Sequence, residues 1–260
     1  MRRMINSIVA IYQKELQSYF ASPLAYGVAG IFWLLAGFFF LIVLRGAFAL
    51  AVDSSLQGRP TDMPFIILQD FLGVMGFLSL FILPILSMGL YAEERKRGTL
   101  ELLATSPIAN WAVALGKLLG VTTFFFTLIL PLMVYETIVL SASTPAFPMT
   151  TLITGHAGLM LMATGILSLG MFISSLTEST ILAAILSFAL VLFLWVLDGL
   201  SKGLTGPLGN LLGHLSLLRH YTNLVQGIVD SSSLILFASY ILLGLFLTAQ
   251  SIEALRFQRS

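Results

Sequence analysis

Residues 91–107 read Tyr-Ala-Glu-Glu-Arg-Lys-Arg-Gly-Thr-Leu-Glu-Leu-Leu-Ala-Thr-Ser-Pro and lie between two long apolar segments. The run of five charges at 93–97 is the densest in the chain. Its first and last members, Glu93 and Arg97, are four residues apart, and this spacing lets them pair on one face of a helix. Gly98 then ends the charged turn, and apolar residues follow at helical spacing up to Pro107. The stretch predicts a short amphipathic helix over 92–106, in a loop between two spans.

The composition of the whole chain indicates a polytopic membrane protein. Of its 260 residues, 58% are hydrophobic and only 10% are charged, whereas soluble domains carry about 25% charged residues. The net charge of +1 gives no reason to expect a nucleic-acid partner. The absence of cysteine excludes disulfides, a thiol nucleophile and a cysteine metal site.

Six segments are long and apolar enough to cross a bilayer, which takes about 20 apolar residues in a helix. They are residues 24–44, 71–90, 118–135, 157–176, 181–197 and 234–252. Residues 1–22 lack the unbroken apolar core of a signal peptide, and their apolar residues recur at three- and four-residue steps. This pattern predicts an amphipathic helix in the membrane interface, with a helix packed on a partner as the alternative. We therefore predict one all-α transmembrane domain over 1–260.

The positive charges predict the orientation of the protein. With the N-terminus inside, nine of the 13 Lys and Arg residues lie on the inner side and four on the outer side. This bias predicts cytoplasmic termini and a cytoplasmic 91–107 stretch. On charge alone, that stretch could instead be a solvated loop whose cations only fix the orientation. The lack of a targeting signal fits a bacterial inner membrane.

Three outer segments remain between the predicted spans. Residues 51–64 are expected to form a polar loop, and 141–151 a short one. Residues 199–233 are long and not plainly polar, because leucines alternate with glycines, serines and two histidines. We predict one or two short helices there, too broken to span, which re-enter the membrane face or cap a cavity.

No catalytic constellation is evident. The chain lacks a phosphate loop, because Gly116-Lys117 has neither the preceding glycines nor the hydroxyl of that motif. We expect no catalytic residue, no metal site and no bound cofactor. The acids Asp70, Glu136 and Asp198 lie at predicted span ends, so we interpret them as interface residues, with transport ligands as the alternative. We expect no mid-membrane acid or base.

The motifs resemble those of a known family. Glu94-Arg95-Lys96-Arg97-Gly98-Thr99-Leu100-Glu101-Leu102-Leu103, followed by Pro107 and Gly116-Lys117, is similar to the coupling-helix signature of exporter-type (type 2) ABC transporter permeases. The stretch from His220-Tyr221 to Gly227-Ile228-Val229-Asp230 resembles the branch related to gliding-motility and nitrous-oxide-reductase-maturation permeases. The resemblance covers essentially the whole chain.

The resemblance implies a permease that pairs with a second permease, identical or homologous, surrounded by membrane lipid. Two copies of an ABC ATP-binding subunit would dock on the pair and bind the ATP and Mg²⁺. The implied ATPase contact is Glu93, Glu94, Arg95, Arg97, Gly98, Thr99, Leu100, Glu101 and Leu103. The implied outer gate is the segment 199–233, with His220, Tyr221, Gly227 and Asp230.

Two other functions stay open at this point. One is a membrane scaffold that anchors an ATPase or an extracytoplasmic assembly without moving a substrate, in which case an extracytoplasmic accessory protein is a partner. The other is an intramembrane enzyme, but no set of catalytic residues in the sequence supports it. The cargo is not encoded in any motif that we recognise.

Overall fold

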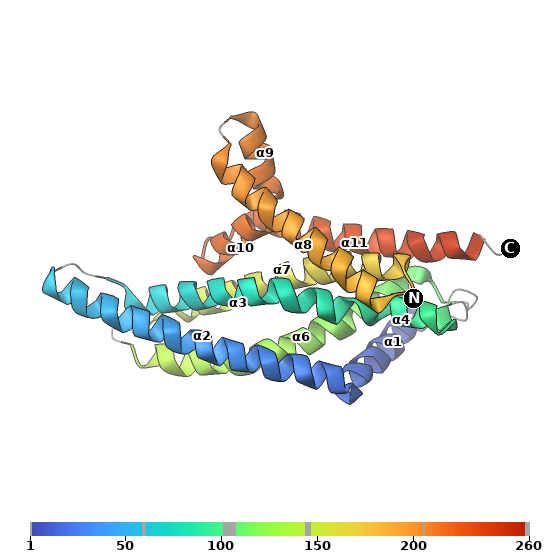
Figure 1. Cartoon of the computed structure of the whole chain (residues 1–260), viewed down its shortest axis with the longest axis horizontal. Helices are drawn as coiled ribbons and strands as arrows, with labels where there is room; N and C mark the ends of the chain where they lie inside the picture. The colour runs from blue at the N-terminus through green and yellow to red at the C-terminus, as the bar shows by residue number, and fades with distance from the viewer. Residues whose placement is uncertain (1, 59–60, 101–107, 144–146, 205, 258–260) are drawn as a thin grey trace.

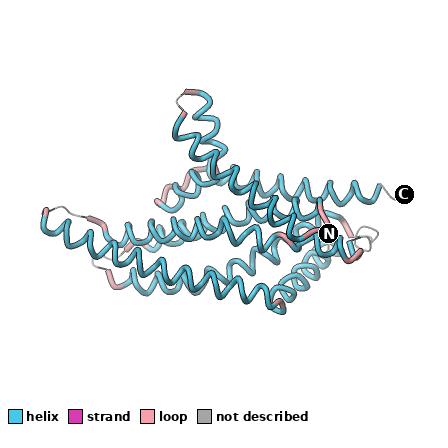
Figure 2. Tube along the Cα trace, in the orientation of Figure 1, coloured by secondary structure: helices cyan, strands magenta, loops and turns pink. Residues whose placement is uncertain are grey.

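The computed structural model describes residues 2–58, 61–100, 108–143, 147–204 and 206–257 (Figure 1). Within these ranges the chain is helical and contains no strand, which confirms the predicted all-α class (Figure 2). The helices are α1 Arg2–Ala21, α2 Pro23–Leu56, α3 Met63–Ser87, α4 Gly89–Lys96, α6 Asn110–Ser141, α7 Met149–Leu176, α8 Thr180–Gly203, α9 Pro207–Leu215, α10 Leu217–Val225 and α11 Ser231–Phe257.

Six helical segments among the described residues are long and apolar enough to cross a membrane, as predicted. Each predicted span lies within one of them, but the helices run further. Helix α2 continues through Arg45 and Asp53 to Leu56, where a polar loop was expected from residue 51. A helix needs apolar residues only over the hydrocarbon core, and beyond it polar side chains face water without breaking the helix. Hydropathy therefore located the spans and not the helix ends.

The bundle has two distinct ends. Helix α4, the first turns of α1 and the last turns of α11 lie together on the right of Figure 1, and we call this the α4 end. Helix α10 packs against α3 and α7 in the opposite half, which we call the α10 end. Which of the two faces the cytoplasm stays a prediction.

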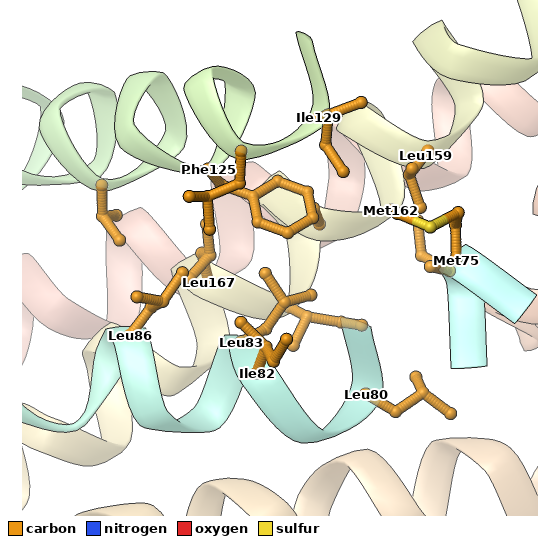
Figure 3. Packing of buried hydrophobic residues seen from close by; sticks show 14 of the residues in the cluster. Met75, Leu80, Ile82, Leu83, Leu86, Phe125, Ile129, Leu159, Met162 and Leu167 are labelled. Carbon is orange, nitrogen blue, oxygen red and sulfur yellow. The ribbon is translucent and has the colours of Figure 1, made fainter. Parts of the chain in front are cut away.

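The hydrophobic core lies between α3, α6 and α7. Leu83, Phe125 and Leu167 come from these three helices and are fully buried where they meet (Figure 3). Within the apolar windows, 67% of residues are buried in α3–α4 and in α7, against 28% in α2 and 22% in α8. Helices α2 and α8 thus leave most of their apolar surface facing outward. Gly170 lets α7 approach α3 closely, because a Cβ there would collide with Ser87.

The charged stretch at 93–97 belongs to the end of the second span helix. The continuous span is interrupted only at Met88, and α4 then runs to Lys96. A turn at Arg97 and Gly98, with Gly98 at φ +70°, separates α4 from a new helical start at Thr99. This corrects the predicted helix over 92–106, which is divided at Gly98. Its later part, including Glu101 and Leu103, lies outside the described residues.

The segment predicted to be broken contains two short helices, α9 and α10. Helix α9 projects away from the bundle together with the end of α8, whereas α10 returns to pack on α7 and α3 (Figure 1). The position of the segment 199–233 relative to a membrane stays a prediction.

Candidate functional site

Helix α1 packs directly on α6 at the α4 end. Gly116 and Gly120 are four residues apart on α6, and this spacing lets another helix approach the backbone. A Cβ at Gly116 would lie 2.8 Å from the Ile11 side chain, and one at Gly120 would lie 2.8 Å from Cβ of Glu15. The amphipathic helix predicted at 1–22 thus rests on its own chain. The two glycines were the sequence signal for this contact, and sequence reasoning missed it.

A buried lysine joins α1, α4 and α6. The Lys117 side chain is only 2% exposed, and its Nζ lies 2.8 Å from Oε1 of Glu15 and 3.0 Å from Oε1 of Glu94. Its ammonium also donates to the carbonyl of Leu90 at 2.8 Å. Burying a charge is costly unless opposite charges and hydrogen bonds compensate it, and here two carboxylates and a carbonyl do so.

Lys14 extends this arrangement toward the surface, with its Nζ 2.9 Å from Oε1 of Glu94. Partial burial by itself lowers the pKa of Lys14, but the hydrogen bond and charge of Glu94, with the charge of Glu15, raise that pKa above its ordinary value. We call these four residues, Lys14, Glu15, Glu94 and Lys117, the Lys117 network. It brings a predicted coupling residue, Glu94, together with Lys117, which belongs to the same signature, and with Lys14 and Glu15, which were not predicted to act with it.

Ser174 of α7 caps the start of α4. Its hydroxyl accepts hydrogen bonds from the backbone N–H groups of Tyr91 and Ala92, each at 3.0 Å. The same hydroxyl donates to the carbonyl of Met88 at 2.7 Å. The first N–H groups of a helix have no partner within it, so a side chain from another helix replaces the missing acceptor. Nothing in the local sequence singles out Ser174 for this role, because its partners lie more than 80 residues away in the chain.

Arg95 fixes α4 to the end of α7. Its guanidinium donates to the carbonyl of Ser175 at 3.0 Å, and its Nε lies 3.5 Å from Oε1 of Glu178. Helix α4 is therefore held on one side by the Lys117 network and on the other side by α7. A displacement of α4 would have to move α1, α6 and α7 with it or break these contacts.

The outward face of the charged stretch carries the pair predicted from its spacing, because Arg97 and Glu93 form an ion pair at the surface. The Thr99 hydroxyl donates to the carbonyl of Glu94 at 3.2 Å and closes the turn at Gly98. Leu100 was expected to face a partner, but its side chain is buried in this chain's own core. An open cavity of about 580 Å³ lies beside this surface, and its lining includes Glu15, Tyr19, Glu93, Lys96 and Arg97.

Tyr221 anchors α10 at the opposite end. Its side chain is buried, and its hydroxyl donates to the carbonyl of Leu72 on α3. A Cβ at Gly76 would lie 2.6 Å from the Tyr221 ring, so only glycine admits the ring at this point. On α7, a Cβ at Gly158 would lie 2.7 Å from Cβ of Leu224. Glycines on two helices thus form the seat of α10.

The other predicted gate residues form the connection from α10 to α11. Nδ1 of His220 lies 2.8 Å from the Ser233 hydroxyl, and its Nε2 lies 3.2 Å from the carbonyl of His214. Burial lowers the pKa of His220. Gly227, at φ +78°, provides the turn, and the Asp230 carboxylate accepts from a backbone N–H in the first turn of α11. The structure therefore gives His220, Gly227 and Asp230 structural contacts at this turn, while Tyr221 points to α3.

Two acids interpreted as interface residues are buried inside the chain. Glu136 is 1% exposed, and its Oε2 lies 3.0 Å from Nε2 of His156 on α7. Asp198 is 7% exposed and accepts from the Ser216 hydroxyl and the Lys202 ammonium, each at 2.7 Å. Burial was not expected for either acid, and it arises because α6 and α8 continue past the predicted span ends and pack there. The location of the two acids at the membrane interface stays a prediction. Asp70 is exposed, as expected.

The described residues gather no group of three His, Cys, Asp or Glu side chains that would hold a metal ion. Comparison with curated proteins finds no match. A family model described as "ABC-2 family transporter protein" matches residues 9–260, which is nearly the whole chain. The finer resemblance to gliding-motility and nitrous-oxide-reductase-maturation permeases stays a prediction. The match, with the six apolar helices, shows that the chain is an integral membrane protein and belongs to the ABC-2 family of transporter proteins.

Proposed function

We propose that the chain is the permease subunit of an ATP-driven exporter and receives the energy of ATP hydrolysis through α4. Membership of the ABC-2 family implies a separate ABC ATP-binding subunit and a paired permease. The absence of a phosphate loop in this sequence fits that division, since ATP and Mg²⁺ are then bound by the partner. Two ATP-binding subunits would dock at the α4 end, on the cytoplasmic side.

The observation that carries this proposal is the attachment of α4 to three other helices. Glu94 ties it to α1 and α6 through the Lys117 network, and Ser174 and Arg95 tie it to α7. To change the population ratio of two conformations of the bundle from 1:99 to 99:1, a partner must bind the second conformation more tightly by about 5.5 kcal/mol. A partner that pushes α4 would deliver such a bias to the bundle, whereas an unattached loop would dissipate it.

The outward apolar surfaces of α2 and α8 suit the second permease and the surrounding lipid. In this arrangement the outer segment 199–233 is the external gate, and α10 is the part of it that rests on the bundle. Rigid rocking of the spans would lift α10 away from its glycine seat on α3 and α7.

The test is coupling in the assembled transporter. The chain is purified with its ATP-binding subunit, and ATP turnover and co-purification are compared for Glu94→Gln and the matched control Glu93→Gln. Glu93 lies in the same run, but its charge is paired only at the surface. We expect Glu94→Gln to uncouple ATP turnover from lipid or cargo stimulation. Glu93 lies on the proposed docking surface, so Glu93→Gln should weaken co-purification at most and leave the turnover of the assembled transporter coupled. Stable assembly without any stimulated turnover in the wild type would favour the scaffold function instead.

A further inference from the structure

Among the described residues, Glu136 and His156 form a buried pair of titratable groups that the proposed coupling route does not use. It joins α6 to α7 in the half of the bundle on which α10 rests. Both side chains are more than nine-tenths buried. Neither carboxyl oxygen of Glu136 receives an in-line hydrogen bond from the described part of the chain. The pair is therefore enclosed, and its carboxyl group lacks the donors that normally stabilise a buried carboxylate.

The hydrogen-bond partners of His156 determine where protons sit. Its Nδ1 lies 3.0 Å from the carbonyl of Leu152. A carbonyl oxygen only accepts, so Nδ1 carries a hydrogen. In a neutral imidazole the other nitrogen, Nε2, then has a lone pair, and it lies 3.0 Å from Oε2 of Glu136. Two lone pairs at this distance repel, so one proton must reside on the pair, either on the imidazole or on the carboxyl.

Helix α10 lies beside this pair. A Cβ at Gly155 would lie 3.6 Å from Cα of Val225, one at Gly158 would lie 2.7 Å from Cβ of Leu224, and these two glycines flank His156 on α7. Burial, and after it the charge of Glu136, raises the pKa of the Tyr221 hydroxyl, so the phenol stays protonated and donates to Leu72. Helix α10 thus presents a neutral side chain near the site. The charged or titratable groups of the other packed helices are exposed or bonded elsewhere: Arg45 and Asp53 on α2, Asp70 on α3, Asp198 on α8, His220 on α10 and Tyr240 on α11. Those of α1 and α4 lie at the α4 end.

We propose that Glu136 and His156 form a proton-binding site that is filled while α10 rests on the bundle and emptied when α10 lifts. This inference rests on the proposed role of the outer segment as a gate. Loss of the proton to water leaves a carboxylate facing an imidazole lone pair in a dry site, which is unfavourable. Separation of α10 from α3 and α7 would admit water and relieve that state. Because the two events are linked, each favours the other.

The experiment measures the position of α10 as a function of pH. The natural chain has no cysteine, so Gln69→Cys on α3 and Thr222→Cys on α10 accept spin labels without background. Both positions lie in the same open groove between α2, α3 and α10. Distances between the labels are recorded for the full transporter in lipid nanodiscs, from about pH 5 to about pH 9, on both sides of neutrality. The same samples are measured with ATP, and proton release is followed with an indicator dye in weak buffer.

We expect the separated population to grow as pH rises, by up to about tenfold per pH unit, and ATP-driven separation to release about one proton per chain. In Glu136→Gln the amide donates permanently to Nε2, so the pH response and the proton release should both disappear. Asp70→Asn is the matched control, because it removes an exposed acid from the same groove and should follow the wild type.

Each failure points to a different cause. ATP-driven separation without proton release, or a wild-type separation that ignores pH, overturns the proton site and leaves the gate intact. A pH response that survives in Glu136→Gln also overturns it and assigns the response to His220, which every variant retains. Labels that never separate, with ATP or with pH, overturn the gate and the proton site together.

Discussion

Lys117 of α6 and Glu94 of α4 form a buried ion pair, with Nζ and Oε1 3.0 Å apart. The same ammonium lies 2.8 Å from Glu15 of α1, so one lysine holds three helices together. Glu94 is the residue of the charged stretch that points into the bundle, whereas its neighbour Glu93 pairs with Arg97 at the surface. This relationship separates the charge that is held inside the bundle from those that lie at its outer surface.

The first prediction concerns that lysine. Lys117→Met leaves two carboxylates without their buried cation, and breaking a buried pair in this way costs about 3–5 kcal/mol. We expect a lower thermal midpoint in detergent and loss of ATPase stimulation by the permease. The control is Lys14→Met, because the Lys14 side chain is 63% exposed and its pair with Glu94 should contribute less than about 1 kcal/mol. Equal effects of the two changes would contradict the central role of Lys117.

A second prediction tests the cap on α4. Ser174→Ala leaves the N–H groups of Tyr91 and Ala92 and the carbonyl of Met88 without their partner, at a cost of about 1–3 kcal/mol. Amide hydrogen exchange should become faster at Tyr91 and Ala92. Ser175→Ala is the matched control, since the Ser175 hydroxyl bonds only within its own helix, to the carbonyl of Phe172. Unchanged protection of α4 in Ser174→Ala would exclude the cap.

The third prediction addresses the seat of α10. Gly76→Ala places a Cβ 2.6 Å from the Tyr221 ring, so overpacking should cost about 1–3 kcal/mol and displace α10. Gly73→Ala on the same helix meets open space and should be neutral, or stabilising by up to about 1 kcal/mol. Spin labels at residues 69 and 222 report the displacement. If the clash with the Tyr221 ring is the cause, Gly76→Ala should cost less in a Tyr221→Ala background than in the natural chain. Equal costs in the two backgrounds would mean that another contact is responsible.

The fourth prediction is a pH dependence at the α10–α11 turn. Because burial lowers the pKa of His220 in the folded protein, the unfolded chain takes up this proton first as pH falls. Stability contributed by neutral His220 is therefore present above about pH 6.5, the ordinary histidine pKa, and is lost as pH falls below it. We measure the thermal midpoints of wild type and His220→Gln between about pH 7.5 and about pH 5. As pH falls, the midpoint of the wild type should decrease more than that of His220→Gln, because only the wild type loses the contribution of a neutral His220. Parallel curves would show that His220 does not titrate differently on folding.

Much of the fold was predictable because a bilayer imposes simple rules. Six apolar segments of about 20 residues require six helices. In the bilayer core there is no water to bond the backbone N–H and C=O groups, and a single segment can pair these groups with one another only as a helix. The pair of Glu93 and Arg97 was also predictable, because both partners lie on one helical turn. The extra length of α2, α6 and α8 was not, since polar residues continue a helix wherever its neighbours or water accept them.

The candidate site divides in the same way. The charged stretch and the broken outer segment stand out in the sequence by composition alone. Their partners do not: Ser174 appears as one small residue among many, and Glu136 appears as an acid at the edge of an apolar window. Both acquire a role only when α7 is placed beside α4 and α6.

The sequence by itself determined the helical class, the six spans, the family signature and the local ion pair, because each depends on residues near one another in the chain. Only the tertiary structure decided which buried charges meet. Lys117 and Glu15 are separated by 102 residues, and Glu136 and His156 lie on different helices. Their contacts depend on how each helix is rotated and how closely it approaches its neighbour. Glycines at 116 and 120 set that approach for α1 on α6, and the glycine at 76 sets it for α10 on α3.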